Sequence, residues 1–373
     1  MSSPQAPATA ELRTALLAWY DRARRDLPWR AVPGAAADPW HVLVSELMLQ
    51  QTTVATVRGR FVPFLARFPT LRALAEAPLD EVLHAWQGLG YYRRARSLHA
   101  CAQAVTLRHG GRLPLDLDKL RALPGIGPYT AAAVAAIAGA RAVVPVDANA
   151  ERVLARLFAL QAPLPAARPR LRALADTLAA PARAGDFAQA LMELGALICA
   201  PRRPACPDCP WQPWCMAART DDPATLPRRS PRAERSARYA TAFVLERSDG
   251  AILFRRRPET GLLGGMIELP STPWLASPSQ AAAEVASAAP VGIAWTDVAG
   301  EVRHRFTHID LTCRLLRGRP DDAAGAGIWC APARFSELAL PTLTRKLLQH
   351  AGLIERGAAR ARRPAGGAAG ARG

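Results

Sequence analysis

Hydrophobic and polar residues along the first half of the chain follow the period of an α-helix. Apolar side chains recur at spacings of three and four from residue 11 to residue 198, as at Leu12 and Leu16. Short breaks that carry proline or glycine, such as residues 88–90, separate the periodic segments. Residues 11–198 are therefore expected to form an all-α domain.

The pattern changes in the second half of the chain. Residues 217–238 are rich in proline and arginine and poor in apolar residues, which is typical of a linker. Residues 239–354 contain short apolar runs and a hairpin signal at 248–250, and they predict a smaller α+β domain. The expected elements are strands at 239–246, 251–255, 293–295, 306–316 and 328–330 and a helix at 343–354.

Both ends of the chain lack any such period. Residues 1–10 are small and polar, and residues 355–373 consist mainly of arginine, alanine and glycine. We expect a disordered N-terminus and a disordered basic tail that attracts phosphate groups without sequence preference.

The charge balance points to a polyanionic partner. The 373 residues include 48 Lys and Arg against 31 Asp and Glu, a net charge of +17, which favours binding to nucleic acid. No apolar stretch is long enough to cross a bilayer, and the N-terminus has no secretory signal, so we expect a cytoplasmic protein. The only lysines are Lys119 and Lys346.

Four of the seven cysteines lie close together. Their spacing is C-x6-C-x2-C-x5-C, at Cys199, Cys206, Cys209 and Cys215. A four-thiolate set this compact suits an iron–sulfur cluster, since zinc sites usually separate two ligand pairs by more residues; a structural zinc site is the alternative. Residues 199–216 would form the cluster loop.

The cluster loop carries Arg202 and Arg203 between its first two cysteines. A loop fixed by the cluster can direct both guanidinium groups at phosphates. The other cysteines, Cys101, Cys313 and Cys330, lie in apolar patterns and are expected to be buried packing residues.

A tight turn with two glycines lies between helical segments. Residues 123–129 read LPGIGPY, with Gly125 and Gly127 in the turn. Glycines allow close approach of a ligand to the backbone, and the N–H groups that start the next helix suit a phosphate. An ordinary helix connector has the same pattern, so the turn alone decides nothing.

Glu46 and Asp147 are candidate catalytic carboxyl groups. Cleavage of a glycosidic bond needs one carboxylic acid to protonate the leaving group and one carboxylate to stabilise positive charge on the sugar. Glu46 lies in an apolar helical segment, either on a solvated stripe or in a pocket that raises its pKa. The alternative for Asp147 is a helix N-cap, and for Asn149 a local backbone hydrogen bond.

Several motifs follow one another in order: LPWR at 27–30, SELMLQQT at 45–52, GLGYY at 88–92, LPGIGPY at 123–129, VDANAERV at 146–153, and the four cysteines. Together they resemble the MutY-type adenine DNA glycosylases of the helix-hairpin-helix and endonuclease III superfamily. The resemblance covers about residues 11–348. It implies an enzyme that flips out and excises adenine paired with 8-oxoguanine or guanine in double-stranded DNA, with a 4Fe–4S cluster.

The resemblance also implies residue roles. Glu46 would be the acid that protonates adenine, and Asp147 would stabilise the oxocarbenium-like sugar or bond to it transiently. Asn149 would help orient Asp147, and Tyr129 would line the sugar pocket. The residues implied to bind DNA are Arg30, Gln50, Gln51, Tyr91, Gly125, Gly127, Arg202, Arg203, Phe306, Thr307 and His308. Among them, Gln50, Gln51 and Tyr91 would fill the gap in the base stack; Tyr91 could otherwise be a core aromatic residue.

Residues 239–354 resemble the Nudix-like domain with which this family recognises 8-oxoguanine. Phe306-Thr307-His308 matches the family's Phe-Ser-His loop, with threonine keeping the hydroxyl, although His308 could equally be an exposed strand residue. A catalytic Nudix domain carries the signature R-E-x-x-E-E, whereas the corresponding stretch here has only Glu284. We therefore expect no second catalytic site.

The resemblance also predicts whether the enzyme cuts the DNA strand after it removes the base. Bifunctional relatives cut the strand through a lysine at the end of the hairpin, where this chain has Tyr129. We expect a monofunctional glycosylase that works as a monomer in the bacterial cytoplasm, at the nucleoid. The alternatives are an endonuclease III-like enzyme that acts on oxidised pyrimidines and a noncatalytic DNA-binding protein.

Overall fold

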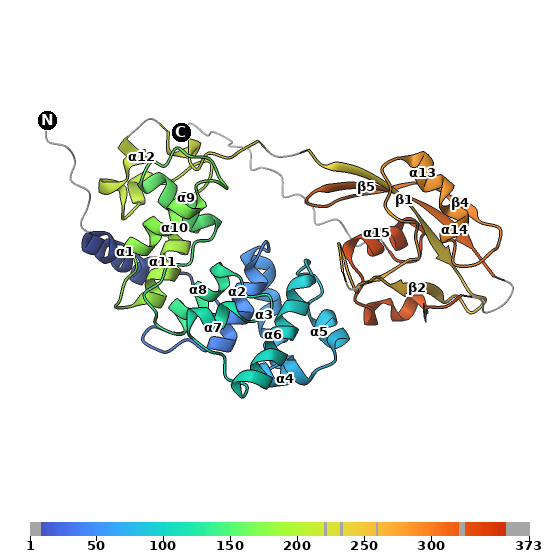
Figure 1. Ribbon diagram of the computed structural model, residues 1–373, viewed down its shortest axis with the longest axis horizontal. Coiled ribbons are helices and arrows are strands. Elements are labelled where there is room, and N and C mark those ends of the chain that lie inside the picture. Colours follow the sequence, from blue (N-terminus) through green and yellow to red (C-terminus); the bar gives the residue numbers. More distant parts are fainter. Residues whose placement is uncertain (1–8, 220–221, 232–233, 259, 321–324, 356–373) are drawn as a thin grey trace, which may run out of the picture. The chain divides into compact units, whose positions relative to one another are not determined.

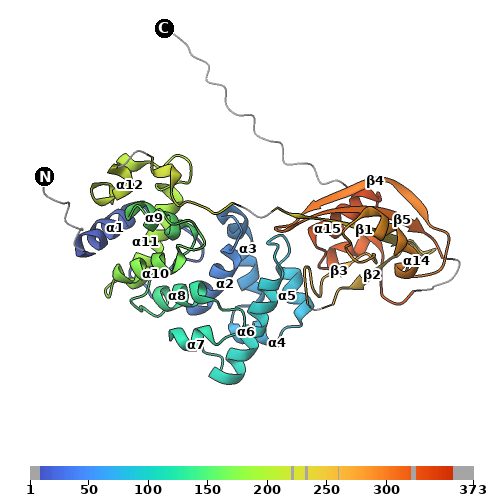
Figure 2. The same cartoon turned by 45° about the horizontal axis from the view of Figure 1, so that its top comes forward.

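The computed structural model describes residues 9–219, 222–231, 234–258, 260–320 and 325–355. The chain divides into two compact units, Met1–Arg232 and Ala233–Gly373 (Figures 1 and 2). The first unit is helical, and the second combines short sheets with helices. The predicted fold class, a helical region followed by a smaller α+β domain, is confirmed.

The first unit is built from helices joined by short turns. In chain order they are α1 (Thr9–Ala23), α2 (Pro39–Leu49), α3 (Val54–Arg67), α4 (Leu71–Glu76), α5 (Leu79–Ala85), α6 (Arg93–His109), α7 (Leu117–Arg121), α8 (Pro128–Ile137), α9 (Ala148–Leu157), α10 (Arg168–Thr177), α11 (Ala184–Leu197), η1 (Cys206–Asp208), η2 (Gln212–Trp214), α12 (Met216–Arg219) and η3 (Pro223–Thr225).

Helix α1 packs with the last helices of this unit, although they are far apart in the sequence. Its apolar face, with Leu12 and Leu16, shares a core with Leu154 of α9 and Leu191 of α11. Both views show α1 beside α11 (Figures 1 and 2). The indole N–H of Trp211 donates a hydrogen bond to Leu12 O at 2.8 Å. This bond joins residues 199–216, which carry the four cysteines, to α1.

Helix α2 forms the centre of the other half of the unit. It begins at Asp38, whose carboxylate accepts the backbone N–H of Trp40 at 2.7 Å, with Pro39 in the first turn. The helix packs against α8, α3 and α6, and residues 42–48 of α2 are buried. Because neighbours cover α2 on several sides, polar residues on it can also be enclosed.

In the second unit, the described residues form two small sheets and short helices. Its elements are β1 (Ser236–Leu245), β2 (Ile252–Arg256), β3 (Ile267–Glu268), α13 (Pro278–Ala283), α14 (Val285–Ala288), β4 (Thr296–Arg305), β5 (Ile309–Gly318), β6 (Ile328–Cys330), η4 (Pro332–Glu337) and α15 (Thr342–His350). Among the described residues the strand orders are β1-β5-β4, with β1 parallel to β5, and β3-β2-β6, which is antiparallel. The buried core of this unit includes Val244, Phe254, Leu315 and Leu347.

One strand prediction in this unit is wrong, and one hairpin signal leads to a turn without an extended hairpin. The run 293–295 is not a strand, since β4 begins at Thr296; the ring of Trp295 instead packs against Phe243 at 5.0 Å. The hairpin signal at 248–250 does produce a tight turn, in which the Arg247 N–H donates to Ala251 O at 2.9 Å. However, β1 and β2 then enter different sheets.

Several predicted boundaries also differ from the structure. Thr9 and Ala10, expected to be disordered, begin α1, and residues 1–8 and 356–373 of the expected disordered ends lie outside the described residues. Part of the expected linker packs on the helical unit, where Leu226 is buried and Leu164 N–H donates to Arg228 O at 2.8 Å. Residues 306–308 form the turn before β5, and α15 ends four residues early.

Within the described residues, none of the helices has the length and hydropathy needed to cross a lipid bilayer.

Candidate active site

Glu46 lies on α2 with its side chain enclosed in the helical unit. Its neighbours on the helix are apolar, and Glu46 itself is 6% exposed. The hydroxyl of Tyr129, the second residue of α8, donates a hydrogen bond of 2.6 Å to Glu46 Oε2. Of the two positions that the sequence left open, the solvated stripe is therefore wrong and the buried position is correct.

Burial changes the acidity of Glu46. Desolvation raises its pKa from the ordinary 4.5 to about 7, and the nearby charge of Asp147 shifts it in the same direction. The hydrogen bond from Tyr129 and the charge of Arg30 oppose this shift. Because the pKa lies near neutrality, a large fraction of Glu46 is protonated at pH 7 and can donate a proton.

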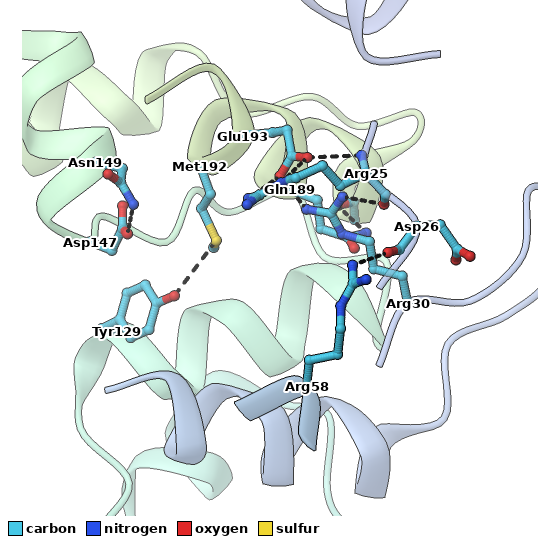
Figure 3. A network of polar contacts seen from close by, with 11 residues as sticks. Arg25, Asp26, Arg30, Arg58, Tyr129, Asp147, Asn149, Gln189, Met192 and Glu193 are labelled. Carbon is cyan, nitrogen blue, oxygen red and sulfur yellow. Dashed lines mark hydrogen bonds and ion pairs between the residues drawn. The ribbon is translucent and has the colours of Figure 1, made fainter. Parts of the chain in front are cut away.

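Asp147 is the N-cap of α9, as the alternative interpretation of the sequence predicted. Capping occupies only one of its two carboxylate oxygens. Its Oδ1 accepts the Ala150 N–H at 2.7 Å, and its Oδ2 accepts Asn149 Nδ2 at 2.9 Å (Figure 3). Burial raises the pKa of Asp147, while the hydrogen bonds from Ala150 and Asn149 and the charge of Arg152 act to lower it. Its carboxylate is thus buried but supported by donors.

The two carboxyl groups belong to one site. The charge of Asp147 acts to raise the pKa of both Glu46 and Tyr129. The Tyr129 hydroxyl contacts Glu46 and also Met192 Sδ of α11, at 3.6 Å. Figure 3 shows Tyr129, Met192, Asp147 and Asn149 grouped together. The helices α2, α8, α9 and α11 therefore bring these groups together from distant parts of the sequence.

Arg152 holds Asn149 in place. Its Nη2 donates to Asn149 Oδ1 at 2.9 Å and to Gly195 O at 2.6 Å, and its Nε donates to Cys199 O at 2.7 Å. The local backbone hydrogen bond considered for Asn149 is replaced by this side-chain network. It connects Asp147 through Asn149 and Arg152 to the first cysteine of the cluster loop.

Gly195 is a site residue that the sequence did not single out. A Cβ at this position of α11 would lie 2.6 Å from Asn149 Cβ and 3.1 Å from two backbone atoms of Asn149. Glycine is therefore required for the close approach of α11 to the start of α9. A glycine inside a predicted helix was the only available signal.

Arg30 has a structural position that differs from the DNA contact expected for it. Its Nη2 forms an ion pair of 2.6 Å with Glu193 Oε2, and its side chain is 8% exposed (Figure 3). Although burial acts to raise the pKa of Glu193, hydrogen bonds from Arg25 and Arg30 hold it at about 2. The guanidinium of Arg30 is therefore engaged inside the helical unit.

The glycines of the turn at 123–129 have different structural requirements. Gly125 has φ +73°, and a Cβ there would lie 2.3 Å from Ser97 Cβ, whereas Gly127 has an ordinary φ and open space around it. Gly127 is also the N-cap of α8, without a side-chain cap, so the backbone N–H groups of the first turn remain available for a ligand.

This difference predicts unequal effects on stability. Gly125→Ala is expected to lower the free energy of unfolding by about 1–3 kcal/mol, because the new methyl group meets Ser97 and the left-handed backbone is strained. Gly127→Ala is expected to lower it by less than about 1 kcal/mol, because the methyl group meets open space and only the poorer N-cap preference of alanine is lost. Urea unfolding of both variants followed by circular dichroism checks this; equal losses would contradict the argument.

The residues expected to enter the base stack lie at two turns. Gln50 is the C-cap of α2, and its amide donates to Thr130 Oγ1 at 3.1 Å. Gln51 and Tyr91, hereafter the wedge residues, have left-handed φ angles of 55° and 46°. Tyr91 is 53% exposed, so its alternative role as a core aromatic is wrong.

The four cysteines of the cluster loop surround one small cavity, together with Arg156. Arg156 is 1% exposed, and its Nη1 donates to Cys199 Sγ at 3.2 Å. In the part of the chain that the structure describes, no three His, Cys, Asp or Glu side chains converge on a single-ion position. Four cysteine sulfurs around a shared cavity match the ligand set of an iron–sulfur cluster in number and chemistry.

Arg202 and Arg203 are exposed on this loop. The three remaining cysteines, Cys101, Cys313 and Cys330, are buried, as expected for packing residues.

In the second unit, Phe306-Thr307-His308 form the turn between β4 and β5. Thr307 and His308 are exposed, whereas Phe306 is half-buried and stacks on Trp274 at 5.3 Å between ring centroids. His308 therefore lies at a turn rather than in a strand. Glu284, the sole glutamate of residues 280–290, accepts a hydrogen bond from Ser287 Oγ at 2.7 Å.

Comparisons with known proteins find a family match in each of the two units. Residues 44–175 match the HhH-GPD superfamily of base excision DNA repair proteins, and residues 241–350 match the NUDIX domain. The adenine DNA glycosylase of Homo sapiens is 36% identical over 405 residues, covering 90% of this chain and 73% of the human protein. That of Mycolicibacterium smegmatis is 48% identical over 195 residues, covering 52% of this chain and 66% of its own.

Among solved structures, a thermostable thymine-DNA glycosylase aligns with a TM-score of 0.51 and 30% identity, covering 57% of this chain and 96% of its own.

Proposed function

Since this chain belongs to the adenine DNA glycosylase family, we propose that it excises adenine paired with 8-oxoguanine or guanine in double-stranded DNA and leaves the strand uncut. The observation that carries the proposal is the pair of buried carboxyl groups: Glu46, with a pKa of about 7, beside Asp147, whose oxygens are held by Ala150 and Asn149. Two carboxyl groups in different environments are what glycosidic cleavage requires.

The two groups divide the work of the reaction. Glu46 donates its proton to the adenine ring while the bond between C1′ of the deoxyribose and the base breaks, and the bonding electrons leave with adenine. Asp147, oriented by Asn149, stabilises the positive charge that develops on the sugar. Water then adds at C1′ and loses a proton, so the products are free adenine and an abasic site.

The pH dependence of excision follows from these roles. The protonated fraction of Glu46 falls as the pH rises through about 7, so the single-turnover rate is expected to fall about tenfold per pH unit well above that value. At low pH the rate is expected to fall again when Asp147 loses its charge. Single-turnover rates measured from pH 5 to pH 9.5 check this; a rate that is constant up to pH 9 would exclude Glu46 as the acid.

Gly195 is expected to affect the rate through Asn149. In Gly195→Ala the added methyl group displaces Asn149 and with it Asp147, and a misplacement of this kind costs about 10²-fold in rate. Affinity for DNA should change little, because Gly195 itself is not among the proposed DNA contacts. Single-turnover kinetics and a binding titration separate the two effects.

A matched control is Gly59→Ala on α3, where a Cβ has open space. This variant should excise at the wild-type rate. Equal rate losses in both variants would show that Gly195 has no specific role.

The absence of strand cleavage is proposed from the position of the lysines. Tyr129 stands where a Schiff-base lysine would be needed, Lys119 lies on α7, and Lys346 lies on α15 with its Nζ donating to Arg303 O at 3.3 Å. Borohydride should therefore trap no covalent enzyme–DNA adduct in high yield. Efficient trapping would overturn this part of the proposal.

DNA contacts are proposed for exposed or turn-borne groups of both units. In the helical unit these are Gln50, Gln51, Tyr91, the backbone at Gly125 and Gly127, Arg202 and Arg203. In the second unit they are Phe306, Thr307 and His308, which we propose recognise 8-oxoguanine. The exposed Thr307 hydroxyl and His308 ring offer hydrogen-bond donors, and the missing Glu-rich signature supports a binding rather than catalytic role for the unit.

The cluster loop is proposed to hold a 4Fe–4S cluster through Cys199, Cys206, Cys209 and Cys215. When bound, the cluster would fix the loop so that Arg202 and Arg203 face phosphate groups. Iron and sulfide analysis of purified protein should give four of each per chain; one zinc per chain would support the alternative metal site.

The decisive experiment compares duplexes under single-turnover conditions. Adenine is placed opposite 8-oxoguanine, guanine or thymine, and the products are analysed with and without alkali, which cleaves abasic sites. We expect rapid formation of alkali-labile sites with 8-oxoguanine, slower formation with guanine and very little with thymine. Release of an oxidised pyrimidine instead would favour the endonuclease III-like alternative, and no release of any base would favour a noncatalytic binding protein.

We also propose that the enzyme works as a monomer in the bacterial cytoplasm, at the nucleoid. Light scattering at micromolar concentration, alone and on a short duplex, checks the first part.

A further inference from the structure

Arg94 is buried at the start of α6, where it binds the end of α2. Its Nη1 donates to Leu47 O at 2.6 Å and to Met48 O at 2.8 Å. Both carbonyls belong to the last turn of α2, where carbonyl groups have no partner within the helix. The positive guanidinium also faces the negative end of the helix dipole. Arg94 therefore fixes the position at which α2 ends, one turn beyond Glu46.

The other side of the guanidinium binds the turn at 88–92. Arg94 Nη2 donates to Leu89 O at 2.9 Å, to Gly90 O at 3.1 Å and to Thr52 Oγ1 at 3.0 Å. The Thr52 hydroxyl is in turn 3.2 Å from Leu89 O. One planar group thus joins the segment after α2 to the turn before α6.

These contacts are made by a charged group without an acidic partner among the described residues. Arg94 lies near the rings of Trp86 and Tyr91, at 5.5 and 5.6 Å from their centroids. Burial lowers its pKa to about 10, which leaves it charged at neutral pH. Several carbonyls arranged around a planar fork suit arginine and not lysine, whose three donors sit on a single nitrogen.

The two segments that Arg94 joins carry the wedge residues. Gln51 follows the C-cap of α2, and Tyr91 follows Gly90 directly; both have a left-handed backbone. Side chains other than glycine keep this conformation only where surrounding contacts impose it. Arg94 donates hydrogen bonds to Thr52, directly after Gln51, and to Gly90, directly before Tyr91. These bonds supply such contacts.

We propose that Arg94 is a positioning residue that holds Gln51 and Tyr91 in their left-handed conformations before DNA binds, so that both enter the duplex as one preformed unit. The inference rests on the proposed function, because it assumes that these side chains fill the gap left by a flipped adenosine. Arg94 itself is too deeply buried to contact the bases.

A double-mutant cycle tests this inference with the full-length protein as purified. The variants are Arg94→Met, Tyr91→Ala and the double variant, and the probe is a duplex with 2-aminopurine beside a 2′-fluorinated adenosine that resists excision. Fluorescence of 2-aminopurine rises when its neighbour leaves the stack. We expect Arg94→Met to reduce both the fluorescence change and the affinity for this duplex about tenfold. In the double variant, both quantities should stay within about twofold of their values in Arg94→Met.

Independent effects that multiply in the double variant would overturn the inference, as would an undiminished fluorescence change in Arg94→Met. Arg93→Met, which removes an exposed charge from the adjacent position, controls for simple loss of attraction to DNA and should leave the fluorescence amplitude at saturating DNA unchanged. A loss of amplitude equal to that of Arg94→Met would count against Arg94.

A second variant covers the case in which Arg94→Met does not fold. Arg94→Lys keeps the charge but has fewer donors, and it should show an intermediate fluorescence change. Full rescue by lysine would overturn the role of the planar fork. Failure of the proposed function would look different from failure of this inference. In that case the wild-type enzyme would neither unstack the fluorinated adenosine nor excise adenine from an ordinary duplex.

Discussion

An enzyme in which glutamine replaces Glu46 is expected to excise adenine about 10²–10⁴-fold more slowly than the wild type. Glutamine has nearly the same shape and can still accept the hydrogen bond from Tyr129, but it has no acidic proton to give to the leaving base. Affinity for a duplex with a non-excisable adenosine should be nearly unchanged. Single-turnover kinetics on adenine opposite 8-oxoguanine measure the loss, and an undiminished rate would exclude Glu46 as the acid.

The same substitution should make the folded protein more stable above neutral pH. The pKa of Glu46 is about 7 in the folded state against an ordinary value of 4.5, so wild-type stability falls as the pH rises from 4.5 to about 7. Above that range the buried carboxylate costs on the order of 3 kcal/mol, which glutamine avoids. A rate loss together with a gain in stability at pH 8 cannot be attributed to misfolding.

Glu151→Gln is the matched control. Glu151 is also a buried glutamate, but it forms an ion pair of 2.6 Å with Arg168. Its replacement should lower stability slightly and leave the excision rate within about twofold. A large loss of rate in this variant would mean that any buried glutamate of the helical unit affects catalysis.

The burial of Glu46 could not be predicted from its helix because of what surrounds that helix. Apolar residues occupy almost every position from 42 to 48, so the sequence has no clear polar face on which a glutamate could be placed. The enclosure comes from α3, α6 and α8, which are separate segments. Periodicity reports the faces of one helix, whereas the pKa of Glu46 depends on which helices cover it.

Long-range contacts explain the other differences. Arg30 meets Glu193, which lies 163 positions away, and Gly195 meets Asn149 across two helices; no local pattern contains such pairs. The strand β4 was missed because it is mostly exposed and polar, while the apolar residues just before it pack on the sheet without joining it. By contrast, the helices, the turn at 123–129 and the cysteine spacing follow from local rules and were predicted.

Replacing Asp147 with asparagine is expected to lower the excision rate by about 10³-fold, because the charge that stabilises the developing oxocarbenium ion is removed. Asparagine is as good an N-cap as aspartate, so its side-chain oxygen can still accept the Ala150 N–H and α9 should keep its start. Loss of rate at unchanged helix content, measured by single-turnover kinetics and circular dichroism, separates the electrostatic role of Asp147 from its capping role.

Asp116→Asn provides the control for capping. Asp116 is the N-cap of α7, where its carboxylate accepts the N–H groups of Asp118 and Lys119 at 3.1 and 3.2 Å near the surface. Because no reacting group depends on its charge, the rate should stay within about twofold of wild type. If Asp147→Asn also stayed within that limit, a capping role would account fully for Asp147, and the division of work between the two carboxyl groups would be wrong.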